Sequence, residues 1–133
     1  ADLSDPVAAL RAATHVAIAN PDLAPYGKAA MATIDFMQVQ DVLDMVVTGE
    51  NIGQTQTLVA SGAADLGFVA ASGIVDAGGA SWPVPADHHA PIRQDAILLT
   101  HGKDNAAARA FLDYLRSGAA RPVIERFGYV AGE

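Results

Sequence analysis

Short apolar runs alternate with helical stretches along this chain. Three of the runs are apolar at successive positions rather than at every second one, and they cover residues 15–19, 66–70 and 96–100. Runs of this kind are typical of strands that are covered on both faces. Because helices are expected between them, the pattern predicts βαβ units, a mostly parallel sheet and an α/β fold.

The helices of the first half are read from their start and stop signals. The first begins at Pro25 and runs to about Met37, and a second covers residues 39–47. A third begins near Ile52 and stops at Gly62, where glycine can adopt the left-handed conformation that ends many helices. A segment rich in Gly, Pro and His, residues 78–91, is the best candidate for a crossover.

The carboxyl-terminal part predicts two more helices. Asp104 can cap the first, whose apolar positions recur at i, i+3, i+4 and i+7 as Ala108, Phe111, Leu112 and Leu115. Ser117 can cap the second, which should end at Gly128. The inward positions of this second helix are Val123, Ile124 and Phe127. Pro122 lies past its first turn, so we expect a local distortion or a later start there.

Composition narrows the class of protein. The chain has 133 residues, of which 51% are hydrophobic, which favours one domain with a real core. No run is long enough to span a membrane, no signal peptide is visible, and no cysteine is present. A formal net charge of -7 argues against nucleic acid as a partner, because phosphate binding needs a basic face.

Two helix starts carry the candidate chemistry. Pro25 suits the first position of a helix, but the preceding Ala24 is a poor cap. The N–H groups of Tyr26, Gly27 and Lys28 are therefore expected to lack a side-chain acceptor and to need water or a ligand.

At the second start, Asn51 is a strong cap and Gln54 completes a pair resembling a capping box. The Ile52 N–H should then stay free. Free donors and the helix dipole attract anions without any net positive charge. A plainer reading stays open, since most helix starts bind only water; Asn51 and Gln54 then only cap, and Tyr26 is an ordinary surface or core aromatic.

The motifs around these starts resemble the molybdate-binding protein of bacterial ABC importers. The matching stretches are HVAIANPDLAPYGKAA at 15–30, GENIGQT at 49–55, ADLGFVA at 64–70, APIRQDA at 90–96, and the segment 111–129. The resemblance implies a type II periplasmic-binding fold, with two α/β lobes and a ligand cleft between them. It also implies a periplasmic, non-enzymatic protein that binds molybdate or tungstate, uses no cofactor and delivers its ligand to a membrane permease.

In this family uncharged N–H and hydroxyl donors hold the oxyanion. Carried over to this chain, Tyr26 should contribute its hydroxyl or N–H, and Ile52 its N–H. The supporting positions are Pro25, Gly27, Asn51 and Gly53. Some relatives have a tyrosine hydroxyl where this chain has Ala70, and Tyr26 is expected to supply that hydroxyl instead.

The family's amino-terminal segment, with its Ser or Thr hydroxyl sites, has no counterpart here. Residues 5–13 resemble the helix that leads into lobe two. We therefore expect residues 1–85 to form lobe two, and residues 86–133 to form the crossover and a carboxyl-terminal segment of lobe one. The oxyanion site should be incomplete and its binding weak, and exposed apolar faces should favour a homo-oligomer.

Other readings stay open. The chain could be a self-associating or partner-completed interaction module, or the ligand-sensing domain of a transcription regulator. The pair His88-His89 is expected in a solvated loop rather than at a metal, because adjacent residues of an extended segment point in opposite directions. No catalytic constellation is evident, so an enzyme is the least favoured class.

Overall fold

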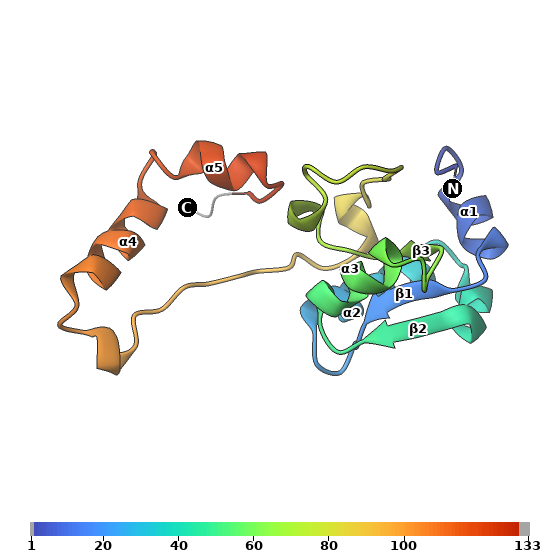
Figure 1. Cartoon of the computed structure of the whole chain (residues 1–133), viewed down its shortest axis with the longest axis horizontal. Coiled ribbons are helices and arrows are strands. Elements are labelled where there is room, and N and C mark those ends of the chain that lie inside the picture. The colour runs from blue at the N-terminus through green and yellow to red at the C-terminus, as the bar shows by residue number, and fades with distance from the viewer. Residues whose placement is uncertain (1, 131–133) are drawn as a thin grey trace. The chain divides into compact units, whose positions relative to one another are not determined.

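The computed structural model describes residues 2–130, and it divides into two compact units, Ala1–Ile92 and Arg93–Glu133. The elements of the first unit are α1 (Pro6–Ala12), β1 (Val16–Ala19), α2 (Pro25–Phe36), β2 (Val46–Gly49), α3 (Ile52–Ala60) and β3 (Leu66–Gly67) (Figure 1). The second unit contains α4 (Ala106–Arg116) and α5 (Arg121–Arg126). None of the helices within residues 2–130 has the length and apolar character needed to cross a membrane.

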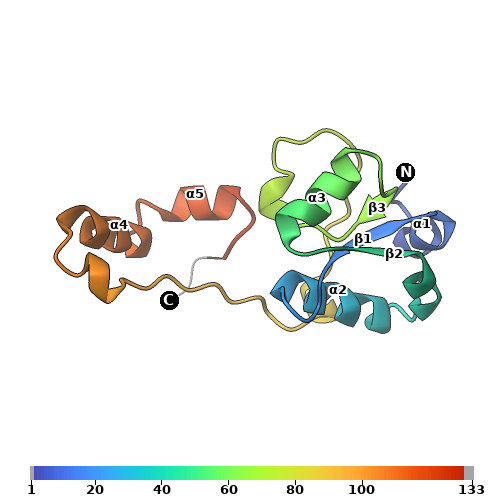
Figure 2. The same cartoon turned by 60° about the horizontal axis from the view of Figure 1, so that its bottom comes forward.

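The sheet of the first unit has the strand order β2-β1-β3, and both pairs are parallel. The register places Val16 of β1 opposite Val46 of β2 and opposite Leu66 of β3. The chain moves from β1 to β2 and then back across β1 to β3. Because parallel crossovers are right-handed, these opposite steps place α2 and α3 on opposite faces of the sheet (Figure 2).

The core lies where α1, α2 and the segment after α2 meet the central strand. Its buried members are Leu10, Val16, Ile34, Val39 and Val42. All four residues of β1 are buried, as expected for a strand with a neighbour on each side and a helix on each face. The α/β fold with a parallel sheet is therefore confirmed.

Several predicted elements are confirmed. β1 lies within residues 15–19, α2 begins at Pro25, and α3 begins at Ile52. Gly62 has a φ of 76°, the left-handed conformation expected after α3. β3 is shorter than predicted, since only Leu66 and Gly67 of residues 66–70 form a strand.

The helix predicted over residues 39–47 is wrong. A 3-10 helix (Gln40–Met45) occupies most of this stretch, and the chain then enters β2 at Val46. The β-branched residues Val46, Val47 and Thr48 disfavour a helix and pair well on a sheet beside β1.

The strand predicted over residues 96–100 is also wrong. The second unit has no strand among its described residues, so this run has no neighbour with which to pair. It ends instead in a 3-10 turn, Thr100–Gly102.

The helices of the second unit differ from prediction at their starts. Asn105 caps α4 in place of the predicted Asp104, accepting the N–H groups of Ala107 and Ala108 at 3.0 and 3.1 Å. Ser117 ends α4 rather than capping α5.

The later start expected from Pro122 is confirmed, because α5 begins at Arg121 and the proline falls in its first turn. Gly128 follows α5 with a φ of 80°. Val123 is 52% exposed, so its predicted inward position is wrong. Ala120 is the one buried residue within residues 93–130, which leaves this unit without a core of its own.

Candidate functional site

Both candidate helix starts lie at one edge of the sheet. The three strands are parallel, so their carboxyl ends share this edge, and α2 and α3 begin directly after β1 and β2. Ligands of open α/β sheets bind at this edge, beside the point where the chain reverses its direction across the sheet. The Asn20 N–H donates to the Gly49 carbonyl at 2.7 Å and so ties the ends of β1 and β2 together.

Two glycines bring the helix starts close to the strand ends. A Cβ at Gly27 would collide with the carbonyl oxygen of Ala19 and lie 2.7 Å from the nitrogen of Pro21. A Cβ at Gly49 would lie 2.8 Å from both the backbone nitrogen and the Oγ1 of Thr55, in the first turn of α3. The close approach at both points requires a residue without a side chain.

The start of α2 satisfies more of its own donors than predicted. The carbonyl of Ala24 accepts the N–H of Gly27 at 3.0 Å and that of Lys28 at 3.3 Å. The expectation that these two N–H groups need water or a ligand is therefore wrong, because a backbone carbonyl accepts both. The missing side-chain cap is confirmed, because Ala24 makes no capping hydrogen bond and Pro25 occupies the first turn. Tyr26, the second residue of the helix, is half-buried.

The start of α3 has the predicted cap. The Asn51 side chain accepts the N–H of Gln54 at 3.0 Å, and the Gln54 side chain accepts the N–H of Glu50 at 2.6 Å. Gln54 thus reaches one residue further back than in a standard capping box. Among residues 2–130, neither the Ile52 N–H nor the Gly53 N–H has a hydrogen-bond acceptor. Two adjacent donors are therefore directed away from α3 at the carboxyl edge of the sheet.

The segment that follows β3 is hydrogen-bonded to α3. The amide of Gln56 donates from Nε2 to the carbonyl of Gly73 at 2.6 Å and so holds the short 3-10 turn Ala71–Gly73. Ala70, where some relatives are expected to have tyrosine, is buried just before this turn.

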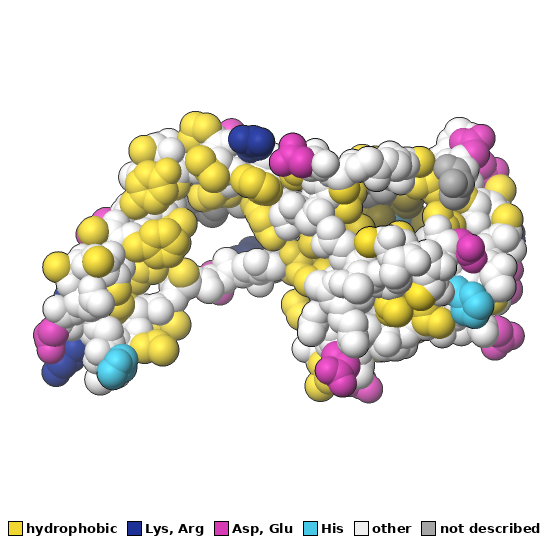
Figure 3. Space-filling model, viewed as in Figure 1, with side chains coloured by type: hydrophobic (Ala, Val, Ile, Leu, Met, Phe, Trp, Pro, Cys, Tyr) yellow, Lys and Arg dark blue, Asp and Glu magenta, His cyan; other side chains and the backbone are white. Residues whose placement is uncertain are grey.

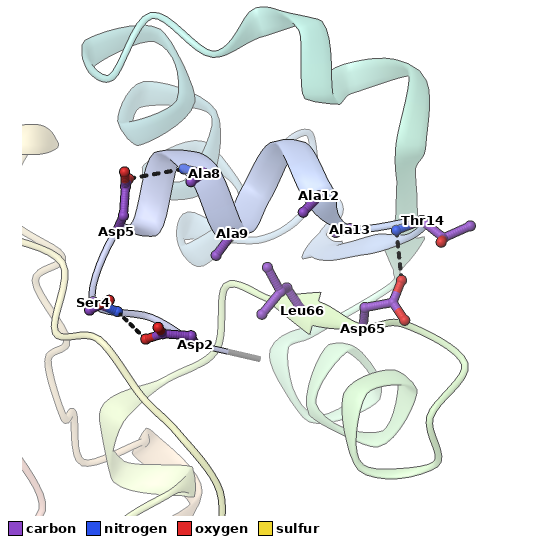
Figure 4. Close-up of a pocket in the computed structure, with 10 residues that line it drawn as sticks. All are labelled: Asp2, Ser4, Asp5, Ala8, Ala9, Ala12, Ala13, Thr14, Asp65 and Leu66. Atoms are coloured by element: carbon purple, nitrogen blue, oxygen red, sulfur yellow. Dashed lines mark hydrogen bonds between the residues drawn. The ribbon is translucent and has the colours of Figure 1, made fainter.

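An open hollow of about 580 Å³ lies at the opposite, amino-terminal edge of the sheet (Figure 4). Its walls are small side chains of α1 together with Leu66 and the carboxylate of Asp65. Asp65 accepts the N–H groups of Thr14 and His15 at 2.7 and 2.9 Å, joining the start of β3 to the start of β1. The hydrogen bonds from His15 and Thr14 hold the pKa of the Asp65 carboxyl below its ordinary value. None of the predicted site residues lines this hollow.

His88 is not in a solvated loop, so that expectation is wrong. Its ring stacks on Phe36 at the end of α2, with 4.2 Å between centroids, and lies 5.9 Å from Trp82. Its Nδ1 is buried without a hydrogen bond. These contacts hold the crossover against α2. Within the described part of the chain, no three His, Cys, Asp or Glu side chains are grouped closely enough to hold a metal ion.

Sequence reasoning missed β2, although this strand supplies Gly49 to the site. The signal was present as the run Val46-Val47-Thr48 before a glycine, but the helical pattern of the preceding residues concealed it.

Several known proteins are similar to this chain in sequence and in fold. Residues 1–130 match the family described as bacterial extracellular solute-binding protein. The molybdate-binding protein ModA of Rhodobacter capsulatus is 46% identical over 118 residues, which make up 87% of this chain and 47% of that protein. ModA of Azotobacter vinelandii is 45% identical over 120 residues, covering 86% of this chain and 48% of that protein.

A solved structure, the periplasmic molybdate-binding protein of Azotobacter vinelandii, matches the whole chain with a TM-score of 0.86 at 31% identity. The match covers 60% of that protein. The chain thus spans about half the length of the curated relatives that it matches.

Proposed function

The chain belongs to the family of bacterial extracellular solute-binding proteins, and from that membership we propose that it supplies one wall of a site for molybdate or tungstate. The family resemblance read from the sequence is confirmed, and this family consists of solute-binding proteins rather than enzymes. A periplasmic location and delivery of the ligand to the membrane permease of an ABC importer belong to the same proposal. So does the division into lobe two (1–85) and a segment of lobe one (86–133).

The observation that carries the proposal is the pair of unpaired N–H donors at the start of α3. Ile52 and Gly53 present their donors beside the joined ends of β1 and β2. A fully deprotonated tetrahedral dianion only accepts hydrogen bonds, so a wall made of donors suits it. Hydrogen phosphate suits it less, because its O–H needs an acceptor. Sulfate has the same charge and shape as molybdate, so only the size of the completed cleft separates the two.

Tyr26 is proposed as the second contributor, through its hydroxyl or its N–H. It lies in the first turn of α2, which starts at the same edge of the sheet. Pro25, Gly27, Asn51 and Gly53 support the two contributors by fixing the helix starts. All of these groups lie at one edge of one sheet, so they form one wall of a site, and binding by this wall alone should be weak.

The test is a nuclear magnetic resonance titration of the chain with sodium molybdate, with sodium chloride at equal ionic strength as the control. The amide signals of Ile52 and Gly53 should shift and saturate only at millimolar molybdate. A tight calorimetric isotherm from a chain that stays monomeric would refute the half-site. Absence of any shift at these two amides would refute their role.

A matched pair of substitutions sharpens the test. Ile52→Pro removes one donor at the first helical position, where proline is tolerated, and Asn51 already has the extended backbone that precedes proline (φ -147°, ψ 173°). Ile52→Val keeps the donor and most of the side chain. Only the proline variant should lose the molybdate-dependent shift of Gly53.

A second candidate is an interaction module that associates with a copy of itself or with a missing partner. It is favoured by the second unit, where Ile97 is 81% exposed and Phe111 is 59% exposed. Light scattering tests it, since a monomeric chain at all concentrations excludes the homo-oligomer.

A further inference from the structure

A single residue holds the loop between β1 and α2. Pro21 has no N–H, and each of the three N–H groups that follow it donates to Asn20. The Asp22 N–H reaches the side-chain oxygen of Asn20, Oδ1, at 2.9 Å. The N–H groups of Leu23 and Ala24 reach the Asn20 carbonyl at 3.1 and 2.8 Å. Asn20 therefore sets the path of the loop into the first turn of α2.

The same residue joins this loop to the end of the neighbouring strand. The Asn20 N–H donates to the Gly49 carbonyl, the hydrogen bond that ties β1 to β2. Glu50 comes next in the chain, and its N–H is accepted at 2.6 Å by the side chain of Gln54, in the first turn of α3. A path of hydrogen bonds and peptide bonds thus runs from the start of α2 to the start of α3, with an amide side chain near each end.

The sheet edge held by these two amides carries acidic residues. Asp22 and Glu50 are both exposed, and Figure 3 shows acidic side chains near the ends of β1 and β2. A carboxylate turned toward the donors at the start of α3 would repel a dianion. The backbone N–H of each acidic residue is bound by an uncharged amide side chain, that of Asn20 or that of Gln54. Aspartate or glutamate could accept the same hydrogen bonds, but each would add a negative charge to the edge.

We propose that Asn20 and Gln54 are positioning residues of the oxyanion site. Asn20 sets the place of Tyr26 in the first turn of α2. Gln54 sets the direction of the Ile52 and Gly53 donors. Each acts through the backbone that it holds rather than by contact with the oxyanion, and the inference rests on the proposed function for the identity of that ligand. A wall that is held in place beforehand avoids the cost of ordering its loops on binding.

The first test needs no ligand. Asn20→Ala and Gln54→Ala each remove one side-chain acceptor and leave the backbone donors and carbonyls in place. In amide nuclear magnetic resonance spectra, Asn20→Ala should shift the signals of residues 22–28 together with those of 49–50. Gln54→Ala should shift the signals of residues 50–53. Changes confined to residues 20–22 in the first variant would overturn the role of Asn20 in placing Tyr26.

Gln40→Ala is the matched control. Gln40 also has an uncharged amide side chain, which donates to the Asp35 carboxylate at 3.2 Å. It lies in the 3-10 helix that leads into β2, and Asp35 lies near the end of α2, so this bond is remote from the helix starts. The control substitution should shift neither helix start and should leave molybdate binding unchanged.

Titration with sodium molybdate then separates positioning from overall stability. The dissociation constant should rise about fivefold in Asn20→Ala and in Gln54→Ala, as expected for the loss of one hydrogen bond of ordinary strength. The response of Tyr26 should fall more in the first variant, and those of Ile52 and Gly53 more in the second. Equal losses in all three variants, the control included, would overturn the proposal, and so would an unchanged affinity in both alanine variants.

Conservative variants keep the test decisive if an alanine variant does not fold. Asn20→Asp and Gln54→Glu retain the acceptor, so the ligand-free signals of both helix starts should match those of the parent chain. The added charge should still weaken molybdate binding. Ligand-free signals displaced as strongly as in the alanine variants would contradict the role of the acceptor.

The proposed function is read separately from the positioning role. Coupled ligand-free shifts in a chain that does not respond to molybdate would remove the proposed function and leave the hydrogen-bonded frame of Asn20 and Gln54 in place. A molybdate response at Ile52 and Gly53 that survives both alanine variants unchanged would leave the function and remove the positioning role.

Discussion

The close packing of α2 on the end of β1 predicts an unusual response to Gly27→Ala. Alanine normally stabilises a helix relative to glycine, by up to about 1 kcal/mol. At Gly27, however, the added Cβ would meet three backbone atoms, namely the oxygen and carbon of Ala19 and the nitrogen of Pro21, the latter two at 2.8 and 2.7 Å. Backbone atoms cannot rotate away as a side chain does, so α2 must move off the strand.

The magnitude follows from these two opposing effects. Forcing extra atoms into a packed site costs about 1–3 kcal/mol, and contacts with backbone on several sides favour the upper value. After subtraction of the gain in helix propensity, Gly27→Ala should lower the free energy of unfolding by about 2 kcal/mol. With a urea m value of about 1–3 kcal/mol/M, the unfolding midpoint falls by roughly 1 M.

Gly53→Ala is the matched control. It lies in the first turn of α3, where an added Cβ would meet only Asn51 Oδ1, at 3.3 Å. This variant should be as stable as the parent chain or more stable, by up to about 1 kcal/mol. Urea unfolding followed by circular dichroism measures both variants. If Gly27→Ala proves at least as stable as Gly53→Ala, the close approach of α2 to β1 does not control stability and the reasoning fails.

Two further predictions concern contacts outside the helix starts. Asp65→Asn weakens the acceptor for the Thr14 and His15 N–H groups. The pKa of the Asp65 carboxyl in the folded chain lies below its ordinary 3.8. The ionised carboxylate therefore contributes its full stabilisation above pH 3.8, and this contribution is lost as the pH falls through the folded pKa. Parent and variant should therefore converge in acid unfolding, and a gap that widens toward low pH would contradict this. The Phe36–His88 stack should give a coupling free energy of about 0.5–1.5 kcal/mol in a double-mutant cycle with alanine, and a value near zero would mean that the crossover is held by other contacts.

The start of α3 was predictable from the sequence because a cap acts over a few residues. Asn51 and Gln54 bind N–H groups within their own turn, and their spacing alone indicates this. The position at which α2 starts was predictable from Pro25, but the hydrogen bonding of its first N–H groups was not. Whether the Gly27 N–H reaches the Ala24 carbonyl depends on the path of residues 20–24, which the end of β2 fixes through Asn20.

Strand assignments depended instead on the presence of a neighbour. Val46–Gly49 is a strand because β1 lies beside it, although the residues before it have a helical pattern. Residues 96–100 also form a short apolar run, yet they form no strand where no neighbour is present within the described second unit. Local sequence cannot separate these cases, because every ladder hydrogen bond of a strand takes its partner from another segment.

The sequence by itself therefore determined the α/β class, the family, the caps of α3 and the glycines that end helices, all of which depend on local geometry or on long matching motifs. Only the tertiary structure decided that β2 exists, that Gly27 and Gly49 bring two helix starts to one edge of the sheet, and that the apolar face of α4 stays uncovered. The physical reason is that caps and turns are satisfied within a few residues, whereas sheet pairing and burial need partners far along the chain or outside it.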